Sequence, residues 1–371
     1  MKKSLKIILS IFISIVVITT VVFGGIAIYR NSIIEKNNFE YLNDTCDKVV
    51  LFIGDGMGEN HIKTAEAYLE KELYFDNFEL NGYVSTFSLN MLGPTDSAAA
   101  ATALATGVKV DNGELSWHNG KDIKSISELA KEKGLGVGIV TTDSISGATP
   151  SGFSAHATSR KDTDNIIESQ LLSDIDLFLG AGYSTYSTYK QSFINKGYKF
   201  VNKYSELNIN SDKIIGAYES ISNYTGTDEK PTLPQLVEFA VDFMENKFSS
   251  GYFLMVEGAH IDKMSHNNKM QEMIEYLDEF DNSIEIVHNK LKNVDNYTLI
   301  VTADHETGGI NYTGQTKEQI DNSLFTKTGH TSADVKYYID WKLKYTITNQ
   351  IPKKIDNTDI FKICKALLYN D

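Results

Sequence analysis

Short apolar runs alternate with segments of helical periodicity along most of the chain. The runs end in glycine or polar residues, as is typical of parallel strands buried on both faces. They lie at Lys48–Gly54, Gly136–Thr142, Gly251–Gly258 and Tyr297–Asp304. Helical spacing of apolar residues appears in Ser125–Gly134, Leu233–Lys247 and Met270–Leu291. This alternation predicts an α/β fold, with a doubly wound, mostly parallel central sheet and helices on both faces.

The N-terminus carries a longer apolar run, Ile7–Tyr29, which contains no charged residue. It is long enough to cross the ~30 Å hydrocarbon core of a bilayer. Because Lys2, Lys3 and Lys6 precede it, the pattern predicts a transmembrane helix that leaves the rest of the chain outside the cytoplasm. A cleaved signal peptide is the alternative, since residues 25–27 (Gly-Ile-Ala) offer a small-x-small cleavage site. The apolar run continues through that site, which favours an uncleaved anchor.

Composition narrows the class of partner. The formal net charge of −14 argues against nucleic acid, because a protein that binds the phosphate backbone needs a basic face. An acidic surface also repels anionic substrates unless a cation sits in the site. The two cysteines, Cys46 and Cys364, could pair in an oxidising compartment, but two free thiols are at least as well supported.

Acidic residues and histidines gather where the expected strands end, which is the edge of an α/β sheet where chemistry usually takes place. Asp55 follows the first strand, Glu257 ends the third, and Asp304 and His305 follow the fourth. Two further segments add Asp262 with His266, four residues apart, and His330. Mixed carboxylate and imidazole ligands suit zinc, and carboxylates with a hydroxyl suit magnesium.

The stretch TDSAAAATALATG places Ser97 in the first turn of an alanine-rich helix. A serine there sits at the positive end of the helix, where a metal can hold it as an alkoxide nucleophile. The segment GATPSGFSAHATSR adds Thr149, a hydroxyl ligand, and Arg160, whose planar fork can hold two phosphate oxygens. The remaining histidines are interpreted as structural: His61, His118, His156, His260 and His288.

Six segments of the chain resemble, in the same order, motifs of the alkaline phosphatase family. They are FIGDGMG, TDSAAAATALATG, GATPSGFSAHATSR, VEGAHIDKMSH, TADHETGG and TGHTSAD. The resemblance covers roughly Lys48 to Tyr345. Together with the N-terminal apolar run and the polar stretch after it, this gives the expected organisation: an anchor or signal segment at residues 1–30, a linker at 31–46, a catalytic domain at 47–345 and an extension of that domain at 346–371.

The resemblance implies hydrolysis of phosphate monoesters to an alcohol and inorganic phosphate. Ser97 is implied as the nucleophile that becomes phosphoserine, and Arg160 as the residue that binds the phosphate. Two zinc ions and one magnesium ion are implied. Their expected ligands are Asp262, His266 and His330 for one zinc; Asp55, Asp304 and His305, with Ser97, for the other; and Asp55, Thr149 and Glu257 for magnesium.

The chain departs from the family pattern in two places. Gly147 stands where family members often carry Asp or His beside the magnesium, which predicts weak, exchangeable magnesium. Lys263, next to Asp262, is shared with some members and is expected to reach the phosphate through water. Only residues 306–329 separate His305 from His330, so the crown-like region found in larger members is expected to be reduced and the site more open.

Two other functions stay open at this level. A related enzyme could act on diesters or sulfate esters, although Arg160 and the Asp-Ser-Ala triplet favour monoesters. Alternatively, a metal-dependent binding protein could have lost turnover, although the complete ligand set favours an enzyme. The physiological substrate and the oligomeric state are open, with a homodimer as one option.

Overall fold

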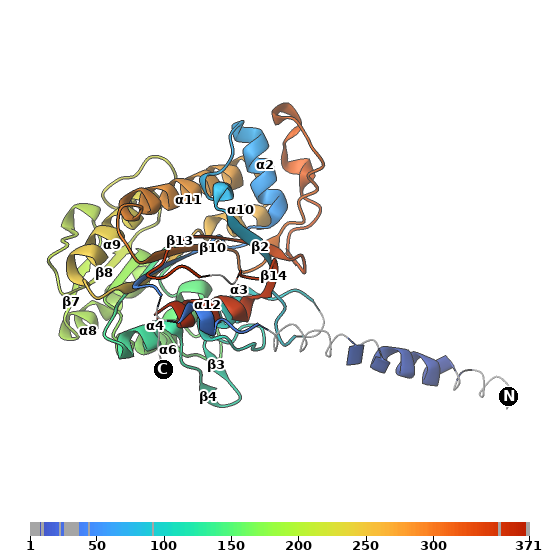
Figure 1. Ribbon diagram of the computed structural model, residues 1–371, viewed down its shortest axis with the longest axis horizontal. Helices are drawn as coiled ribbons and strands as arrows, with labels where there is room; N and C mark the ends of the chain where they lie inside the picture. Colours follow the sequence, from blue (N-terminus) through green and yellow to red (C-terminus); the bar gives the residue numbers. More distant parts are fainter. Residues whose placement is uncertain are drawn as a thin grey trace. The chain divides into compact units, whose positions relative to one another are not determined.

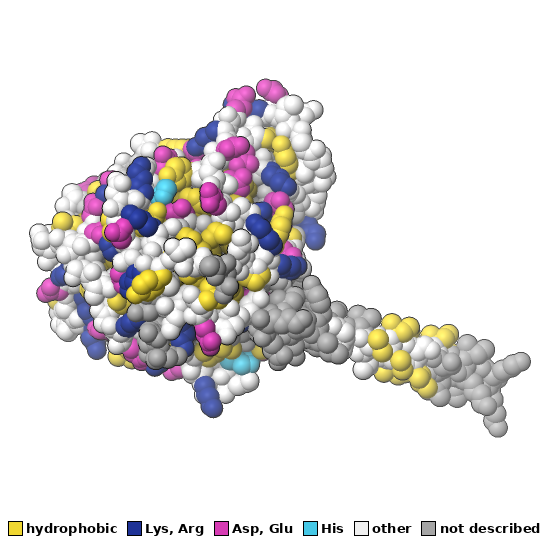
Figure 2. All heavy atoms as spheres, in the orientation of Figure 1, with side chains coloured by type: hydrophobic (Ala, Val, Ile, Leu, Met, Phe, Trp, Pro, Cys, Tyr) yellow, Lys and Arg dark blue, Asp and Glu magenta, His cyan; other side chains and the backbone are white. Residues whose placement is uncertain are grey.

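The computed structural model describes residues 8, 11–21, 24–25, 37–43, 45–90, 93–347 and 350–368. The chain divides into two compact units, Met1–Asn38 and Phe39–Asp371. In the first unit, residues 11–21 are helical and their apolar side chains are exposed (Figure 2). Among the described residues no helix is both long and apolar enough to cross a membrane, and the expected span Ile7–Tyr29 lies partly outside them.

The four strands expected from the sequence lie next to one another at the centre of the second unit. They are β1 (Lys48–Ile53), β5 (Gly136–Ser144), β9 (Tyr252–Glu257) and β10 (Tyr297–Thr302). Their order is β10-β1-β9-β5, and every neighbouring pair is parallel. All six residues of β9 and of β10 are buried, which explains their continuous apolar sequence. The prediction of a mostly parallel central sheet is therefore confirmed.

The sheet extends on both sides of this centre. In the described part of the chain it has ten strands, in the order β14-β2-β13-β10-β1-β9-β5-β6-β8-β7. The added strands are β2 (Leu80–Ser85), β6 (Leu177–Ala181), β7 (Tyr198–Val201), β8 (Lys213–Tyr218), β13 (Val335–Lys342) and β14 (Lys354–Asp356). Only β13 runs antiparallel to its neighbours, β10 and β2. Two small ribbons, β3 (Trp117–His118) with β4 (Lys121–Asp122) and β11 (Glu306–Thr307) with β12 (His330–Thr331), lie outside the sheet.

Helices cover both faces of the sheet (Figure 1). One face carries α2 (Glu59–Leu69), α9 (Leu233–Lys247), α10 (His260–His266) and α11 (Met270–Leu291). The other carries α3 (Ser97–Thr106), α4 (Ile126–Glu132), α5 (Ala148–Ser154), α6 (Thr163–Leu172) and α12 (Asn357–Leu368). The helices α7 (Tyr183–Tyr186) and α8 (Lys190–Asn195) precede β7. Short 3-10 turns complete the unit: η1 (Glu40–Leu42), η2 (Tyr74–Asn77), η3 (Ser187–Tyr189), η4 (Tyr204–Glu206), η5 (Lys317–Gln319) and η6 (Asn322–Leu324).

The alanine-rich helix α3 is buried along its whole length, which explains its composition. Its N-cap, Asp96, accepts a hydrogen bond from the backbone N–H of Ala99 at 3.0 Å. It packs closely against α5, since a Cβ added at Gly152 would lie 2.8 Å from the Cβ of Ala101. At its other end Gly107 has a left-handed φ of 71° and lies against Phe361 of α12. Small side chains thus let α3 sit deep in the unit.

Packing begins earlier in the chain than the expected linker allows. Phe39, Leu42 and Cys46 fall within residues 31–46 but are buried in the hydrophobic core. The backbone N–H of Cys46 donates to the carbonyl of Leu367 at 3.2 Å, so this segment lies against the end of α12. Cys46 and Cys364 are both buried free thiols.

A buried lysine joins the end of α3 to the start of α12. Lys109 Nζ lies 3.0 Å from Asp356 Oδ2 and donates to Asn357 Oδ1 at 2.5 Å and to the carbonyl of Phe87 at 2.6 Å. Its side chain is only 5% exposed. The ammonium therefore neutralises a carboxylate that has no access to water.

Replacing Lys109 with Met should lower the free energy of unfolding by about 3–5 kcal/mol, because Asp356 would remain buried and unpaired. Lys124 is the matched control, since its pair with Glu132 is about half exposed (51% and 48%). Lys124→Met should change stability by less than about 1 kcal/mol. Urea unfolding of the three proteins measures the difference, and equal losses in the two variants would contradict the buried ion pair's role.

Candidate active site

Three carboxylates meet where the central strands end. In the register of the sheet Ile53 of β1 stands beside Glu257 of β9 and Thr302 of β10. Asp55 and Asp304 each follow their strand by two residues, so both lie at the same edge as Glu257. The parallel sheet thereby gathers side chains that are far apart in the sequence.

His305 joins Asp55 and Asp304 in one group, called the Asp55 group below. Its Nε2 lies 3.2 Å from Asp304 Oδ2 and 3.7 Å from Asp55 Oδ1. One ligand atom from each residue lies within 4.8 Å of the others, which is close enough to share an ion. The other oxygen of Asp304, Oδ1, accepts the backbone N–H of Gly56 at 3.0 Å. All three residues are buried.

A second group, the Asp262 group, combines Asp262, His266 and His330. Asp262 and His266 lie one turn apart on α10, and His266 Nε2 is 3.3 Å from Asp262 Oδ1. His330 Nε2 lies 3.1 Å from His266 Nε2 and 3.7 Å from Asp262 Oδ1. Each imidazole Nδ1 faces a backbone carbonyl, that of Thr328 or of Thr95. A carbonyl oxygen can only accept a hydrogen bond, so each Nδ1 carries the proton and each Nε2 keeps its lone pair for a cation.

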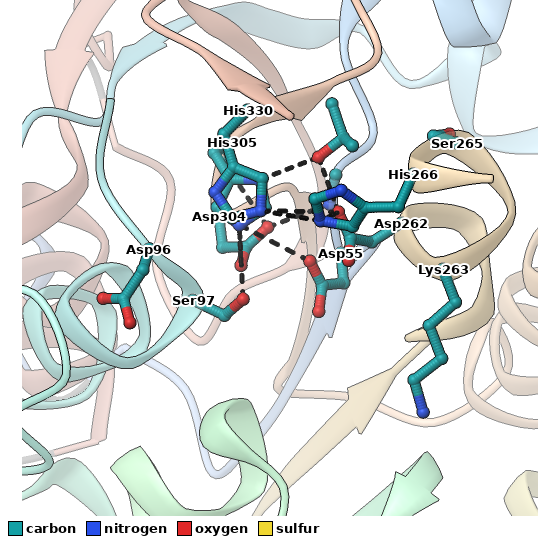
Figure 3. Close-up of polar contacts among 12 residues, drawn as sticks. Asp55, Asp96, Ser97, Asp262, Lys263, Ser265, His266, Asp304, His305 and His330 are labelled. Atoms are coloured by element: carbon teal, nitrogen blue, oxygen red, sulfur yellow. Dashed lines mark hydrogen bonds and ion pairs between the residues drawn. The ribbon is translucent and has the colours of Figure 1, made fainter. Parts of the chain in front are cut away.

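Ser97 reaches these groups from the start of α3 (Figure 3). Its Oγ lies 3.3 Å from His305 Nε2, and its side chain is buried. Lys263 of α10 lies on the opposite side of the cluster.

Arg160 is tied to the N-cap of the same helix. Its Nη1 lies 3.2 Å from Asp96 Oδ2, and its backbone N–H donates to the carbonyl of Gly113 at 2.8 Å. The other oxygen of Asp96 accepts from the backbone N–H groups of Ala99 and Gly113. Asp96 therefore fixes the start of α3 and the guanidinium together. The sequence analysis did not predict this pairing of Asp96 with Arg160.

A third set, the Glu257 group, consists of Glu257, Thr149 and Asp55. Thr141 donates a hydrogen bond to Glu257 Oε2. Thr149, on α5, approaches Glu257 closely enough to lower its pKa, but without the geometry of a hydrogen bond. The pKa of Asp55 is raised first by burial, then by Asp304 and Asp262, and then by Glu257, as expected for neighbouring carboxylates.

The buried groups fit divalent cations. Burial, reinforced by Asp304, raises the pKa of Asp55 well above its usual range. Burial and the nearby Asp143 carboxylate raise the pKa of Glu257 to about 8. Buried oxygens without a hydrogen-bond partner among the described residues include Asp55 Oδ1, Asp304 Oδ2 and Thr149 Oγ1. Burial lowers the pKa of His305 to about 3, so the imidazole is neutral, as a metal ligand must be. The carboxylate oxygens repel one another unless a cation lies between them. Together with neutral imidazole nitrogens they form a suitable donor set for zinc and magnesium.

Thr307 is a second residue that the sequence analysis missed. Its hydroxyl donates to Asp262 Oδ1 at 2.5 Å and faces His305 Nδ1 at 3.3 Å. It thereby connects the Asp55 and Asp262 groups. Its position two residues after His305 could have predicted this contact, since alternate residues of an extended segment share a face.

The remaining histidines have other partners among the described residues. They are His61 with Ser265, His118 with Glu114, His156 with Glu128, His260 with Tyr276 and His288 with Asp340. His118 and Glu114 also form a third possible metal-binding group with Asp111, but the hydrogen bonds of this partly exposed loop account for their proximity. These five histidines therefore have partners outside the ligand groups described above, as their structural interpretation predicts.

Comparison with known proteins agrees with the geometry. A model of the family named alkaline phosphatase matches residues 47–363. The chain is 33% identical over 288 residues to alkaline phosphatase 4 of Bacillus subtilis (strain 168), a match that covers 70% of this chain and 61% of the relative. The chain thus spans about three fifths (61%) of the length of that relative.

Solved structures show the same likeness. The alkaline phosphatase of the Antarctic bacterium TAB5 superposes with a TM-score of 0.76 and 26% identity, covering 88% of this chain and 100% of that chain. A variant of the TAB5 enzyme, described with Mg bound in its M3 site, gives a TM-score of 0.74 and 25% identity over 89% of this chain and 100% of that chain. With the family model matching residues 47–363, the chain belongs to the alkaline phosphatase family.

Proposed function

We propose that the protein hydrolyses phosphate monoesters to an alcohol and inorganic phosphate. One observation carries the proposal: Ser97 Oγ lies 3.3 Å from His305 Nε2, at the edge of the buried carboxylate and imidazole groups. Arg160 is held beside it through Asp96, at 3.2 Å. A nucleophile, cation-binding groups and a guanidinium on one side are the parts that phosphoryl transfer needs.

The donor set supports two zinc ions and one magnesium ion. The Asp262 group would hold one zinc, the Asp55 group with Ser97 the other, and the Glu257 group the magnesium. When bound, these ions supply the positive charge that stabilises the attacking and leaving oxygens. The magnesium assignment is also supported by the TAB5 variant with Mg in its M3 site.

The residues of the chain divide the reaction between them. Ser97 Oγ attacks phosphorus in line, the P–O bond to the alcohol breaks, and phosphoserine forms, while the proton lost by Ser97 is made up on the leaving alcohol oxygen. The N-terminus of α3 favours negative charge on Ser97, and Arg160 binds two phosphoryl oxygens with its fork. Water then attacks phosphorus from the other side, which releases inorganic phosphate and returns the proton to Ser97.

The contacts identified serve the phosphoryl group rather than the alcohol, which supports a broad range of small monoester substrates. Lys263, across the site from Ser97, would help to neutralise the phosphate through water. We also propose that the enzyme works outside the cytoplasm, attached through residues 1–30 or released by cleavage within them. The lysines before the apolar run support this location, and a homodimer remains a prediction.

Replacing Ser97 with Ala should reduce monoesterase turnover on the order of 10³-fold or more, while leaving a measurable rate from direct attack by water. Ser127→Ala is the matched control, because Ser127 is also a buried serine in the first turn of a helix, α4. A chromogenic monoester assay and trapping of the phosphorylated residue provide the test. Wild-type turnover in Ser97→Ala, or phosphate on another residue, would disprove the assignment.

Arg160→Ala should weaken the binding of substrate and inorganic phosphate by about 1.5–3 kcal/mol, since a charge-assisted bidentate contact is lost. Arg160→Lys should recover only part of this, because an ammonium lacks the planar fork. The inhibition constant for inorganic phosphate and the zinc content measure binding and metal loading separately. Loss of zinc from Arg160→Ala would show that the arginine is structural.

Removal of metal should abolish turnover and lower the thermal midpoint, because the Asp55 carboxylate and its neighbours would then repel one another. Zinc at about a thousand times its dissociation constant should restore about 4 kcal/mol of stability. Chelation, zinc titration and differential scanning calorimetry check this. A chelated protein that keeps both its activity and its midpoint would contradict the metal site.

A further inference from the structure

Gly147 leaves a space beside the Glu257 group, and another side chain fills it. A Cβ added at Gly147 would lie 2.9 Å from Asp143 Oδ2 and 3.2 Å from Asp143 Cγ. The carboxylate of Asp143, from the end of β5, therefore occupies the volume where a side chain at position 147 would begin. Gly147 itself has an ordinary φ of −60° and caps α5 without a side-chain hydrogen bond. Backbone conformation thus does not require glycine there, but the Asp143 carboxylate leaves little room for anything larger.

Asp143 is connected to the Glu257 group through one hydroxyl. Its backbone N–H donates to Thr141 Oγ1 at 2.8 Å, and Thr141 Oγ1 donates to Glu257. Of the charged groups around Glu257, Asp143 has the largest effect in raising its pKa. The two carboxylates repel each other, and a cation bound near them would relieve this repulsion.

The two oxygens of Asp143 have different surroundings. Oδ1 accepts a hydrogen bond from Lys263 Nζ. Oδ2, on the side of Gly147, accepts none from the described residues. The side chain is 31% exposed, so water reaches it. This arrangement suits a carboxylate that is fixed on one side and accepts hydrogen bonds from water on the other.

We propose that Asp143 holds the water molecules of the magnesium ion bound by the Glu257 group, in place of a side chain at position 147. The proposal rests on the proposed function for the identity of the ion. Mg²⁺ keeps several waters in protein sites, and carboxylates that accept hydrogen bonds from them raise its affinity. Asp143 is thus a positioning residue, and Lys263 orients it.

This inference reverses an expectation from the sequence. The absence of a side chain at Gly147 predicts weak magnesium, whereas a carboxylate delivered from β5 predicts magnesium that stays bound after mild chelation. The carboxylate of Asp143 would thus serve where a side chain at position 147 is absent.

The test compares two variants that break the same ion pair from opposite sides. Asp143→Asn keeps the size of the side chain and removes its charge, and we expect Mg²⁺ to bind roughly 10–100-fold more weakly. Lys263→Met removes the ammonium and keeps the carboxylate, and we expect Mg²⁺ to bind at least as tightly as in the wild type, because one repelling charge is lost. Both full-length variants are loaded with zinc and titrated with Mg²⁺ alone by calorimetry, while zinc content and thermal midpoint report folding.

A purely structural role gives a different result. If Asp143 only pairs with Lys263, the two variants would lose the same contact and their magnesium affinities would change together or not at all. Either outcome would overturn the proposal. No substrate is present in the titration, so the result is independent of turnover: a protein without monoesterase activity would refute the proposed function and leave this measurement interpretable.

Discussion

The active site depends on carboxylates that are buried without a lysine or arginine partner. Asp55, Glu257 and Asp304 are at most 7% exposed, and none forms an ion pair with a lysine or arginine of the described residues. Burying such charges is unfavourable unless a cation balances them. The sheet holds them together because β1, β9 and β10 end in register. The register of the sheet therefore positions these oxygens together, where a bound cation would balance their charge.

Helix α3 has to bring Ser97 to that edge of the sheet while packing closely against α5. This requirement explains its small, mostly alanine side chains. Larger side chains at Ala101 or Gly152 would push α3 and α5 apart. Asp96 then performs two functions at the start of the helix, since one oxygen caps the backbone and the other orients Arg160. Ser97 and Arg160, the proposed nucleophile and phosphate-binding residue, are thus positioned by a single carboxylate.

The sequence predicts the parts of the structure whose signals are local. Strand ends are marked by apolar runs that stop at polar residues, so Asp55, Glu257 and Asp304 could be placed at one edge in advance. By contrast, burial along β13 follows no simple alternation, since Tyr337, Tyr338 and Ile339 are all buried. Its antiparallel pairing depends on β10 and β2. The pairing of Asp96 with Arg160 is likewise tertiary, because 64 positions separate the two residues.

Position 147 shows why motifs transfer imperfectly from one family member to another. A motif records which residue stands at each position, whereas a metal ion responds to where charge lies in space. Asp143 and Gly147 are four residues apart, and the turn between them brings the carboxylate of one against the Cα of the other. The motif alone therefore indicates that a side chain is missing at position 147, whereas in the fold the carboxylate of Asp143 lies there.

The packing of α12 has a consequence for the order in which parts of the domain can fold. This last described helix lies against α3. The carbonyl of its residue Leu367 accepts a hydrogen bond from the backbone N–H of Cys46, at the beginning of the domain. The first and last segments of the catalytic unit therefore support each other, and the Ser97 helix lacks one of its walls until both are present. Because α12 is the last described helix of the domain, α3 lacks this packing partner until nearly the whole domain has been synthesised. We therefore expect the arrangement around Ser97 to form late in folding.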